Sequence, residues 1–258
     1  MHAKKTSEGA IQIMASPLGL LLSSKTLRQK VVHFLRNHYF SDLNLSIPIA
    51  NGYWAQIMEK DAYDCFSEIF IKQEYLEFLP KDTISRILDI GAHYGYFSLW
   101  LQSRNPEVEL YSLMIEPSPS CTRSLQNLVN QEKLTNRFYY LQRAIALPAS
   151  KNITFYDRPY MAGSRHSLSH LENAIQVQTL HEEELVKKFE PPYDLIKCDI
   201  EGSEWEFLNN YQNLIKESKY LLLEWHSWHE GGGGFLRSKS LPTLLTLERF
   251  APPNQFLQ

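Results

Sequence analysis

One stretch, RILDIGAHYGYFSLWL at residues 86–101, constrains the fold of this 258-residue chain more than any other. Its first part, residues 86–90, is an apolar run with one acid near its end, which is typical of a buried strand. Gly91 and Gly95 then supply a turn, and the residues that follow have the pattern of a helix. A strand that passes through a glycine turn into a helix is the first half of a βαβ unit. The stretch therefore predicts a parallel α/β sheet.

Similar strand patterns recur downstream, and helical patterns separate most of them. They lie at residues 109–116, 137–145, 193–200 and 219–226. Near-continuous apolar strands of this kind predict a mostly parallel, Rossmann-like sheet with helices on both faces. Residues 152–157 and 175–180 predict two extra strands around a loop.

The flanking regions set the expected domain organisation. Helical spacing at residues 24–39 predicts a basic amphipathic helix, and residues 65–80 predict a second helix that stops at Pro80. We expect a partly helical N-terminal extension over 1–62 and one α/β domain over 63–258. The segment after the last predicted strand contains no obvious pair of closing strands.

Composition narrows the classes of partner and the compartment. The net charge of −3 does not point to a polyanion as the main partner, so we expect no nucleic-acid partner. Cys65, Cys121 and Cys198 lie far apart and form no CxxC, which favours a reducing compartment and argues against zinc. The apolar segment at residues 11–22 is too short to span a bilayer and lacks a clean signal cleavage site. We therefore expect a cytoplasmic protein without a membrane span.

The ends of the predicted strands indicate where a ligand binds. In an open parallel sheet, ligands bind beyond the carboxyl ends of the strands, where the strand order reverses. Asp89, Glu116 and Asp199 close three of the predicted strands, so we expect them at one crevice. A nucleoside triphosphate would need GxxxxGK[ST], and no lysine follows Gly95 at the required spacing.

Two further classes of ligand could bind at the glycine turn after the first predicted strand. A nicotinamide dinucleotide calls for GxGxxG, whereas the chain has only GxxxG, and Asp89 would repel a pyrophosphate. S-adenosylmethionine has no phosphate and carries an ammonium and a sulfonium group, which Asp89 attracts directly or through water. Glu116 is placed to accept the ribose hydroxyls, and the end of the third strand is placed to flank the adenine. The residues favour S-adenosylmethionine.

Each of these residues also has a purely structural interpretation. The two glycines are common turn residues, Asp89 could cap the helix that follows it, and Glu116 could pair with Arg123. These interpretations leave unexplained why two acids close neighbouring strands.

The segments ILDIGAHYGYFSL, IEPSP, DLIKCDIEGSEWEFL and LLLEWH together resemble the FkbM-type family of S-adenosylmethionine-dependent O-methyltransferases. The resemblance covers roughly residues 63–226, and IKCDIEGSE is its most specific part. It implies a class I methyltransferase fold and methylation of a hydroxyl on a small acceptor such as a sugar, a polyketide or another secondary metabolite. His93 is a departure, because the family commonly has Asn there.

The resemblance places residues of the Asp-x-Glu-Gly signature, Asp199, Glu201 and Gly202, beside the methyl group. A hydroxyl needs a base to become a good nucleophile, and His226 after the fifth predicted strand has a suitable imidazole. We therefore expect His226 as base, with Asp199 and Glu201 as the other catalytic residues. The expected cofactor-binding residues are Asp89, Gly91, Ala92, His93, Gly95, Tyr96, Glu116, Ala144 and Asp199.

Two alternatives stay open at this stage. Asp199, Glu201, Glu224 and His226 offer oxygen and nitrogen ligands that could hold magnesium or manganese, although we expect no metal. The chain could also be a non-catalytic S-adenosylmethionine-binding or interaction module that kept the fold and lost the acceptor site.

Overall fold

The computed structural model describes residues 45–58, 61–145, 151–156, 174–200, 203–225 and 243–248. The expected helix at residues 24–39 lies outside these ranges, as do the predicted site residues Glu201, Gly202 and His226. Within the described residues, no helix combines the length and the apolarity needed to cross a bilayer.

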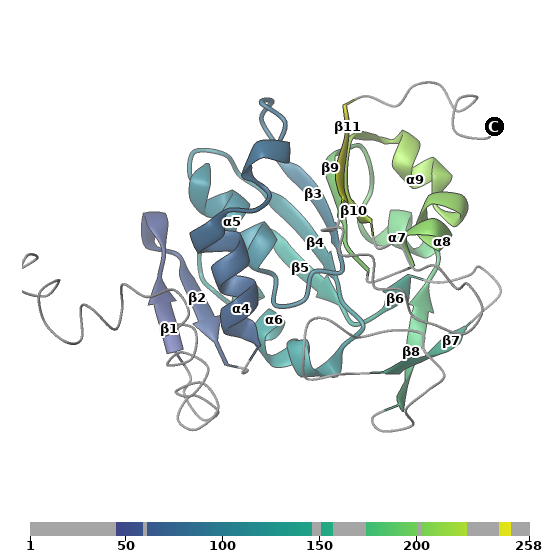
Figure 1. The fold of residues 1–258 in the computed structure, drawn as a ribbon, viewed down its shortest axis with the longest axis horizontal. Helices are drawn as coiled ribbons and strands as arrows, with labels where there is room; N and C mark the ends of the chain where they lie inside the picture. Colours follow the sequence, from purple (N-terminus) through teal and green to yellow (C-terminus); the bar gives the residue numbers. More distant parts are fainter. Residues whose placement is uncertain are drawn as a thin grey trace, which may run out of the picture. The chain divides into compact units, whose positions relative to one another are not determined.

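A six-stranded sheet forms the centre of the fold, with the strand order β11-β10-β9-β3-β4-β5 (Figure 1). Its strands are β3 (Arg86–Ile90), β4 (Tyr111–Ile115), β5 (Phe138–Leu141), β9 (Tyr193–Cys198), β10 (Ser218–Trp225) and β11 (Thr243–Glu248). All pairs are parallel except β10 with β11. The strand order reverses between β3 and β9, which confirms the expected mostly parallel sheet and places the switch point beside the first β–α turn.

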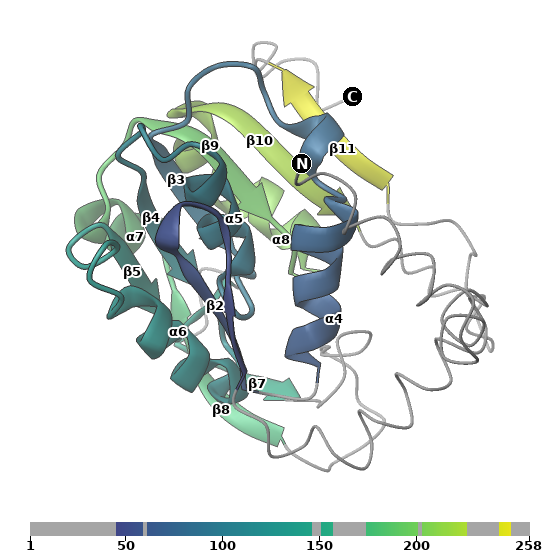
Figure 2. The same ribbon diagram turned by 90° about the vertical axis from the view of Figure 1, so that its left-hand side faces the viewer.

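Helices cover both faces of this sheet, as the apolar strands predicted. One face carries α4 (Ala62–Phe66), α5 (Tyr96–Arg104) and α6 (Thr122–Val129), which Figure 2 shows in front of the sheet. The other face carries α7 (Glu182–Lys188), α8 (Glu204–Asn210) and α9 (Gln212–Lys216). Alternate residues of each strand enter the two cores: Ile87 and Leu195 pack under the first set of helices, and Leu88 and Ile196 under the second.

One expectation about the strands was wrong. The predicted strand at residues 137–145 is two strands, because the Arg143 N–H donates to the Leu141 carbonyl and bends the chain. The second piece, β6 (Ala144–Ile145), joins β7 (Asn152–Tyr156) and β8 (Ala174–Leu180) in a separate sheet. In the C-terminal segment, where the sequence shows no obvious pair of closing strands, one strand, β11, pairs with β10 along its length.

The prediction of one helix over residues 65–80 was also wrong in its bounds. It begins at Ala62 as α4, continues as η2 (Ser67–Lys72) and ends at Gln73, which has a left-handed backbone with φ 54°. A short turn of helix, η3 (Leu76–Phe78), follows. The reversal at Gln73 ends the helix before Pro80 and turns the chain so that Tyr75 points into the body of the domain.

A hairpin precedes these helices. It consists of β1 (Leu45–Pro48), η1 (Ala50–Gly52) and β2 (Trp54–Ile57). Ala55 and Ile57 belong to the same hydrophobic core as α5 and α6. The expected boundary between residues 62 and 63 stays a prediction, but this hairpin packs as part of the α/β unit.

Candidate functional site

A pocket of about 190 Å³ opens at the carboxyl ends of β3, β4, β9 and β10. A single water needs roughly 10–15 Å³ on the same measure, so the pocket holds a small molecule. Among the predicted site residues, those that line it are Gly91, Ala92, His93, Glu116, Ala144 and Asp199. Asp89, Gly95 and Tyr96 are not in the lining.

The turn after β3 forms the floor of the pocket. The N–H groups of Gly91 and Ala92 both donate to the Ile115 carbonyl, at 2.9 and 3.1 Å. Gly91 has φ 72°, and a Cβ built on it would lie 1.6 Å from the backbone oxygen of Asp199. Glycine is required here because the turn after β3 and the end of β9 approach each other backbone to backbone.

Gly95 and Tyr96 have structural roles in this geometry. Gly95 has φ 75° and precedes α5, and a Cβ there would crowd Leu128 and Met114. The Tyr96 hydroxyl is directed toward the hairpin, where it donates to the Gln56 carbonyl at 2.5 Å. Their predicted contact with a cofactor has no support in the geometry of the pocket.

Asp89 lies beneath the pocket with no exposed surface. Its Oδ2 accepts a hydrogen bond from Ser98 at 2.6 Å, and its Oδ1 lies 3.9 Å from the Lys197 ammonium. Burial raises the pKa of Asp89, and the charge of Lys197 opposes that rise. Direct contact between Asp89 and a ligand has no support here, and Asp89 instead holds Lys197 across the β3–β9 pair.

Lys197 is the cation at the centre of the site. Its ammonium donates to the Gly91 carbonyl at 2.9 Å and to Asp199 Oδ2 at 3.2 Å. Burial lowers the pKa of Lys197, but the charges of Asp199, Asp89 and Glu224 outweigh that effect and the net pKa is raised. Lys197 therefore stays charged and ties the floor of the pocket to the end of β9.

Tyr75 joins this network from outside the sheet. Its hydroxyl donates to Glu224 Oε2 at 2.9 Å and lies 3.4 Å from Asp199 Oδ2. Burial and the two carboxylates raise the pKa of Tyr75 well above its usual value, so it stays a hydrogen-bond donor. Tyr75 could not be found from the sequence, because it lies in a segment with a helical pattern. Glu224 could be found from its position near the end of an apolar strand.

Glu116 is buried just beyond β4 and faces the pocket. Its Oε2 accepts the backbone N–H of His93 at 2.8 Å, and its Oε1 accepts that of Ser118 at 2.9 Å. Each carboxylate oxygen has more than one acceptor site, so both can still receive a hydrogen bond from a ligand. These contacts replace the alternative pairing with Arg123.

The described lining of the pocket carries more negative than positive charge. Its basic residues are His93, Arg143 and Lys197, and its acidic residues are Glu68, Glu74, Glu116, Asp199 and Glu224. Such a lining attracts a ligand with positive charge and repels a phosphate. Among the described residues, no group of three or more His, Cys, Asp or Glu side chains is arranged to hold a metal ion.

Comparison with known proteins identifies the family of this chain. A family model described as the methyltransferase FkbM domain matches residues 89–251, which is more than half of the chain. The chain belongs to the FkbM methyltransferase family. Membership in this family, together with the observed strand order, confirms the expected class I methyltransferase fold.

Relatives of this FkbM methyltransferase are distant. Hexuronic acid methyltransferase AglP of Haloferax volcanii is 30% identical over 80 residues, which is 31% of this chain and 33% of AglP. An FkbM methyltransferase from Methylobacillus flagellatus is 18% identical with a TM-score of 0.40, covering 79% of this chain and 50% of that one. The METTL16 methyltransferase domain is 16% identical with a TM-score of 0.39, covering 74% and 75% of the two chains. The match thus spans a third of AglP and half of the Methylobacillus chain.

Proposed function

We propose that this FkbM methyltransferase uses S-adenosylmethionine to methylate a hydroxyl of a small acceptor, such as a sugar or another secondary metabolite. The observation that carries the proposal is the acid-rich pocket at the strand switch point, where Glu116 and Asp199 both reach the lining. Family membership supports the methyl transfer. Three free cysteines, Cys65, Cys121 and Cys198, support a cytoplasmic location as part of the same proposal.

The residues present fit this cofactor. Glu116 has acceptor capacity left on both oxygens, which suits the two ribose hydroxyls. Ala144 lines the pocket after the kink that ends β5 and suits the flat face of an adenine. Gly91 and Ala92 line the pocket without a bulky side chain, and the carboxylate of Asp199 suits the cationic end. When bound, S-adenosylmethionine supplies an electrophilic methyl group.

The chain's own contribution is to orient the acceptor and remove its proton. Asp199 and Glu224 share the Tyr75 hydroxyl, so their carboxylates are held in fixed positions at the ends of β9 and β10. Such carboxylates accept hydrogen bonds from an acceptor hydroxyl and align it. His226, the proposed base, follows β10 by one residue in the sequence, and Glu201 follows Asp199 by two.

A sugar-like acceptor is supported by two observations. The relative AglP is by its name a hexuronic acid methyltransferase. Carboxylates such as Asp199 and Glu224 are good acceptors for hydroxyl donors.

Methyl transfer from labelled S-adenosylmethionine tests the proposal. We expect the purified chain to label a component of a panel of sugars and hydroxylated metabolites, and the product to resist mild alkali as an ether does. An alkali-labile product would indicate a methyl ester and contradict hydroxyl methylation. Asp199→Asn should lower turnover on the order of 10²-fold, whereas Asp194→Asn, at the other end of β9, should leave it near the wild-type rate.

The non-catalytic module predicts a different outcome. Such a protein would bind S-adenosylhomocysteine in a calorimeter but transfer no label to the panel or to extract of the source cell. That combination would replace the enzyme proposal with the module.

A further inference from the structure

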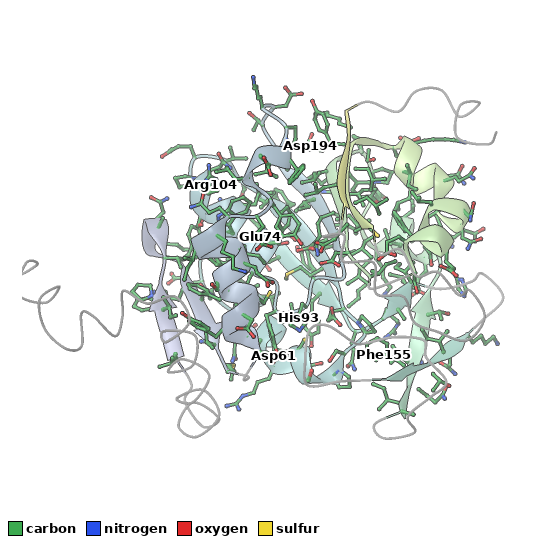
Figure 3. All side chains as sticks on the ribbon, in the orientation of Figure 1. Asp61, Glu74, His93, Arg104, Phe155 and Asp194 are labelled. Atoms are coloured by element: carbon green, nitrogen blue, oxygen red, sulfur yellow. The ribbon has the colours of Figure 1, made fainter. Side chains whose placement is uncertain are left out.

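The described lining of the pocket comes from two parts of the chain. One part consists of the strand ends and the turns after them, which carry every residue that the proposed function assigns to the cofactor. The other part precedes the central sheet and belongs to α4, η2 and the turn after η2. We call its lining residues the helical wall: Cys65, Glu68, Ile69, Glu74 and Tyr75. Glu74 of the helical wall and His93 of the turn after β3 thus line one pocket from different segments (Figure 3).

The strand order shows what lies next to the proposed cofactor site. Along the sheet the strands follow one another as β10-β9-β3-β4, and Asp199, Gly91 and Glu116 come directly after β9, β3 and β4. Neighbouring strands are about 4.8 Å apart, so these three positions span roughly 10 Å of the edge. Leu223 pairs with Cys198, which puts Glu224 of β10 beside Asp199. Glu224 is therefore the next carboxylate along this edge, past the residues assigned to the cofactor.

Asp199 and Glu224 are held by different donors. The Lys197 ammonium joins Asp199 Oδ2, at 3.2 Å, to the Gly91 carbonyl in the floor of the pocket, at 2.9 Å. The Tyr75 hydroxyl has one proton to donate, and it lies 2.9 Å from Glu224 Oε2 but 3.4 Å from Asp199 Oδ2. Asp199 is thus tied to the floor of the pocket, and Glu224 is tied to the helical wall.

The Tyr75 ring is fixed by packing that does not involve its hydroxyl. It is 8% exposed and lies edge-on to the ring of Phe97 in α5, with centroids 5.0 Å apart. The backbone before it is fixed as well, because the Glu74 N–H donates to the Glu68 carbonyl at 3.2 Å across the reversal at Gln73. A donor that is held in this way fixes the direction of the carboxylate that it contacts.

We propose that the helical wall is the methyl-acceptor side of the site, that Glu224 binds the hydroxyl to be methylated, and that Tyr75 is the positioning residue that orients Glu224. The inference rests on the proposed function for the reaction itself. A carboxylate has about four acceptor positions, so the bond from Tyr75 does not prevent Glu224 from receiving a hydroxyl of the substrate. Asp199, held by Lys197, then serves the cationic end of the cofactor.

The first test is Tyr75→Phe, which keeps the ring and its packing on Phe97 and removes only the hydroxyl. Turnover of the compound that the wild type labels fastest in the sugar panel should fall about tenfold, the value of one hydrogen bond to a charged group. The affinity for S-adenosylhomocysteine, measured by calorimetry, should stay within about twofold of the wild type. Unchanged turnover, or a loss of cofactor affinity as large as the loss of turnover, would overturn the proposal.

Tyr220→Phe is the matched control. The Tyr220 hydroxyl also donates to a carboxylate, Asp82 Oδ2 at 2.5 Å, but from the start of β10. Turnover and cofactor affinity should both stay near the wild type in this variant. A loss in Tyr220→Phe equal to that in Tyr75→Phe would show a general effect on β10 and overturn the assignment of Tyr75.

Glu224→Gln tests the assignment without changing the helical wall. It should lower turnover on the order of 10²-fold and leave the affinity for S-adenosylhomocysteine within about twofold. Because Tyr75 acts through Glu224, adding Tyr75→Phe to Glu224→Gln should cause no further loss of turnover. If the loss in the double variant equals the product of the two single losses, Tyr75 acts independently of Glu224 and the inference fails.

The binding measurements separate this inference from the proposed function. Asp199→Asn should weaken S-adenosylhomocysteine binding, whereas Tyr75→Phe and Glu224→Gln should not. If the wild type binds S-adenosylhomocysteine but labels no compound, the proposed methyl transfer fails. The binding comparison still decides between the two sides of the pocket, because equal losses of affinity in all three variants would place Tyr75 and Glu224 on the cofactor side.

Discussion

The two ends of the central sheet each carry a buried aspartate beside a lysine, but they use them differently. At the amino ends of the strands, Asp194 Oδ2 accepts the N–H groups of Ser85 and Arg86 and the Ser85 hydroxyl, at 2.7–3.0 Å. Its Oδ1 accepts the Lys219 ammonium at 2.5 Å. Figure 3 shows Asp194 at the opposite end of the domain from His93. Both oxygens are satisfied, so this end is built for stability.

The carboxyl ends of the same strands are not balanced in this way. Among the described residues, Lys197 faces three carboxylates, those of Asp89, Asp199 and Glu224. An excess of buried negative charge costs stability unless a cation joins it. The comparison teaches that the same pair of residue types is fully hydrogen-bonded at one end and lies among an excess of carboxylates at the other, where we propose that the cationic cofactor binds.

The largest expected effect comes from Lys197→Met. This substitution leaves Asp89, Asp199 and Glu224 facing one another without a cation, so the free energy of unfolding should fall by about 3–5 kcal/mol at pH 7. Urea denaturation measures it. The gap from wild type should narrow as the pH falls toward 5, because burial already raises the pKa of Asp89 and its protonation removes one of the unpaired charges. A loss below about 1 kcal/mol would contradict the central role of this lysine.

Asp194→Ala should have an intermediate effect. It leaves the N–H groups of Ser85 and Arg86 without their acceptor, which should lower the free energy of unfolding by about 1–3 kcal/mol. Turnover and cofactor affinity should stay near wild type, because Asp194 lies at the far end of the sheet. A loss of cofactor affinity in Asp194→Ala would contradict the assignment of a purely structural role to this end of the sheet.

The pH dependence of Asp194 sharpens the same comparison. Burial alone would raise the pKa of Asp194, but the hydrogen bonds from Lys219 and Ser85 outweigh it and the pKa is lowered. A folded pKa below the unfolded value of about 3.9 gives stability that is present above that value and is lost as the pH falls through the folded pKa. The gap between wild type and Asp194→Ala should therefore stay constant from pH 7 to about 5 and shrink below about 4.

Lys219→Met should have the smallest effect. The Lys219 side chain is 59% exposed, so water screens its pairing with Asp194 and the expected loss is at most about 1 kcal/mol. Added salt should reduce even that difference, whereas it should change the Lys197→Met effect little. Equal losses in the two lysine variants would show that burial does not distinguish the two ends.

The sequence predicted the frame of the molecule because local patterns determine it. The strand at residues 86–90 was found with its observed bounds, and the rule that acids at strand ends meet at one crevice located Glu116 and Asp199 in the pocket. The prediction failed where the fold depends on a contact that leaves no pattern in the sequence. The bend at Arg143 depends on a single backbone hydrogen bond, which leaves no pattern in an apolar run.

Side chains that reach the site from elsewhere were beyond sequence reasoning. Tyr75 contacts Glu224 across 149 positions of the chain, and Asp61 reaches His93 from the start of another helix. Asp89 shows the reverse error. Its position in the motif suggested a ligand contact, whereas the register of β3 with β9 places it under Lys197. Contacts between residues that lie far apart in the sequence cannot be predicted until the register of the strands is known.

The backbone contact under Gly91 has a consequence for how this enzyme can diversify. Position 91 and the main chain of Asp199 leave no volume for any side chain between them. Mutational libraries that aim at new acceptors will therefore yield folded variants from the rim, for example at Glu68, Glu74 and Phe155, and almost none from the base of the cavity. Substitutions at the rim of the pocket can therefore change which acceptor is selected, whereas the backbone contact at its base cannot change.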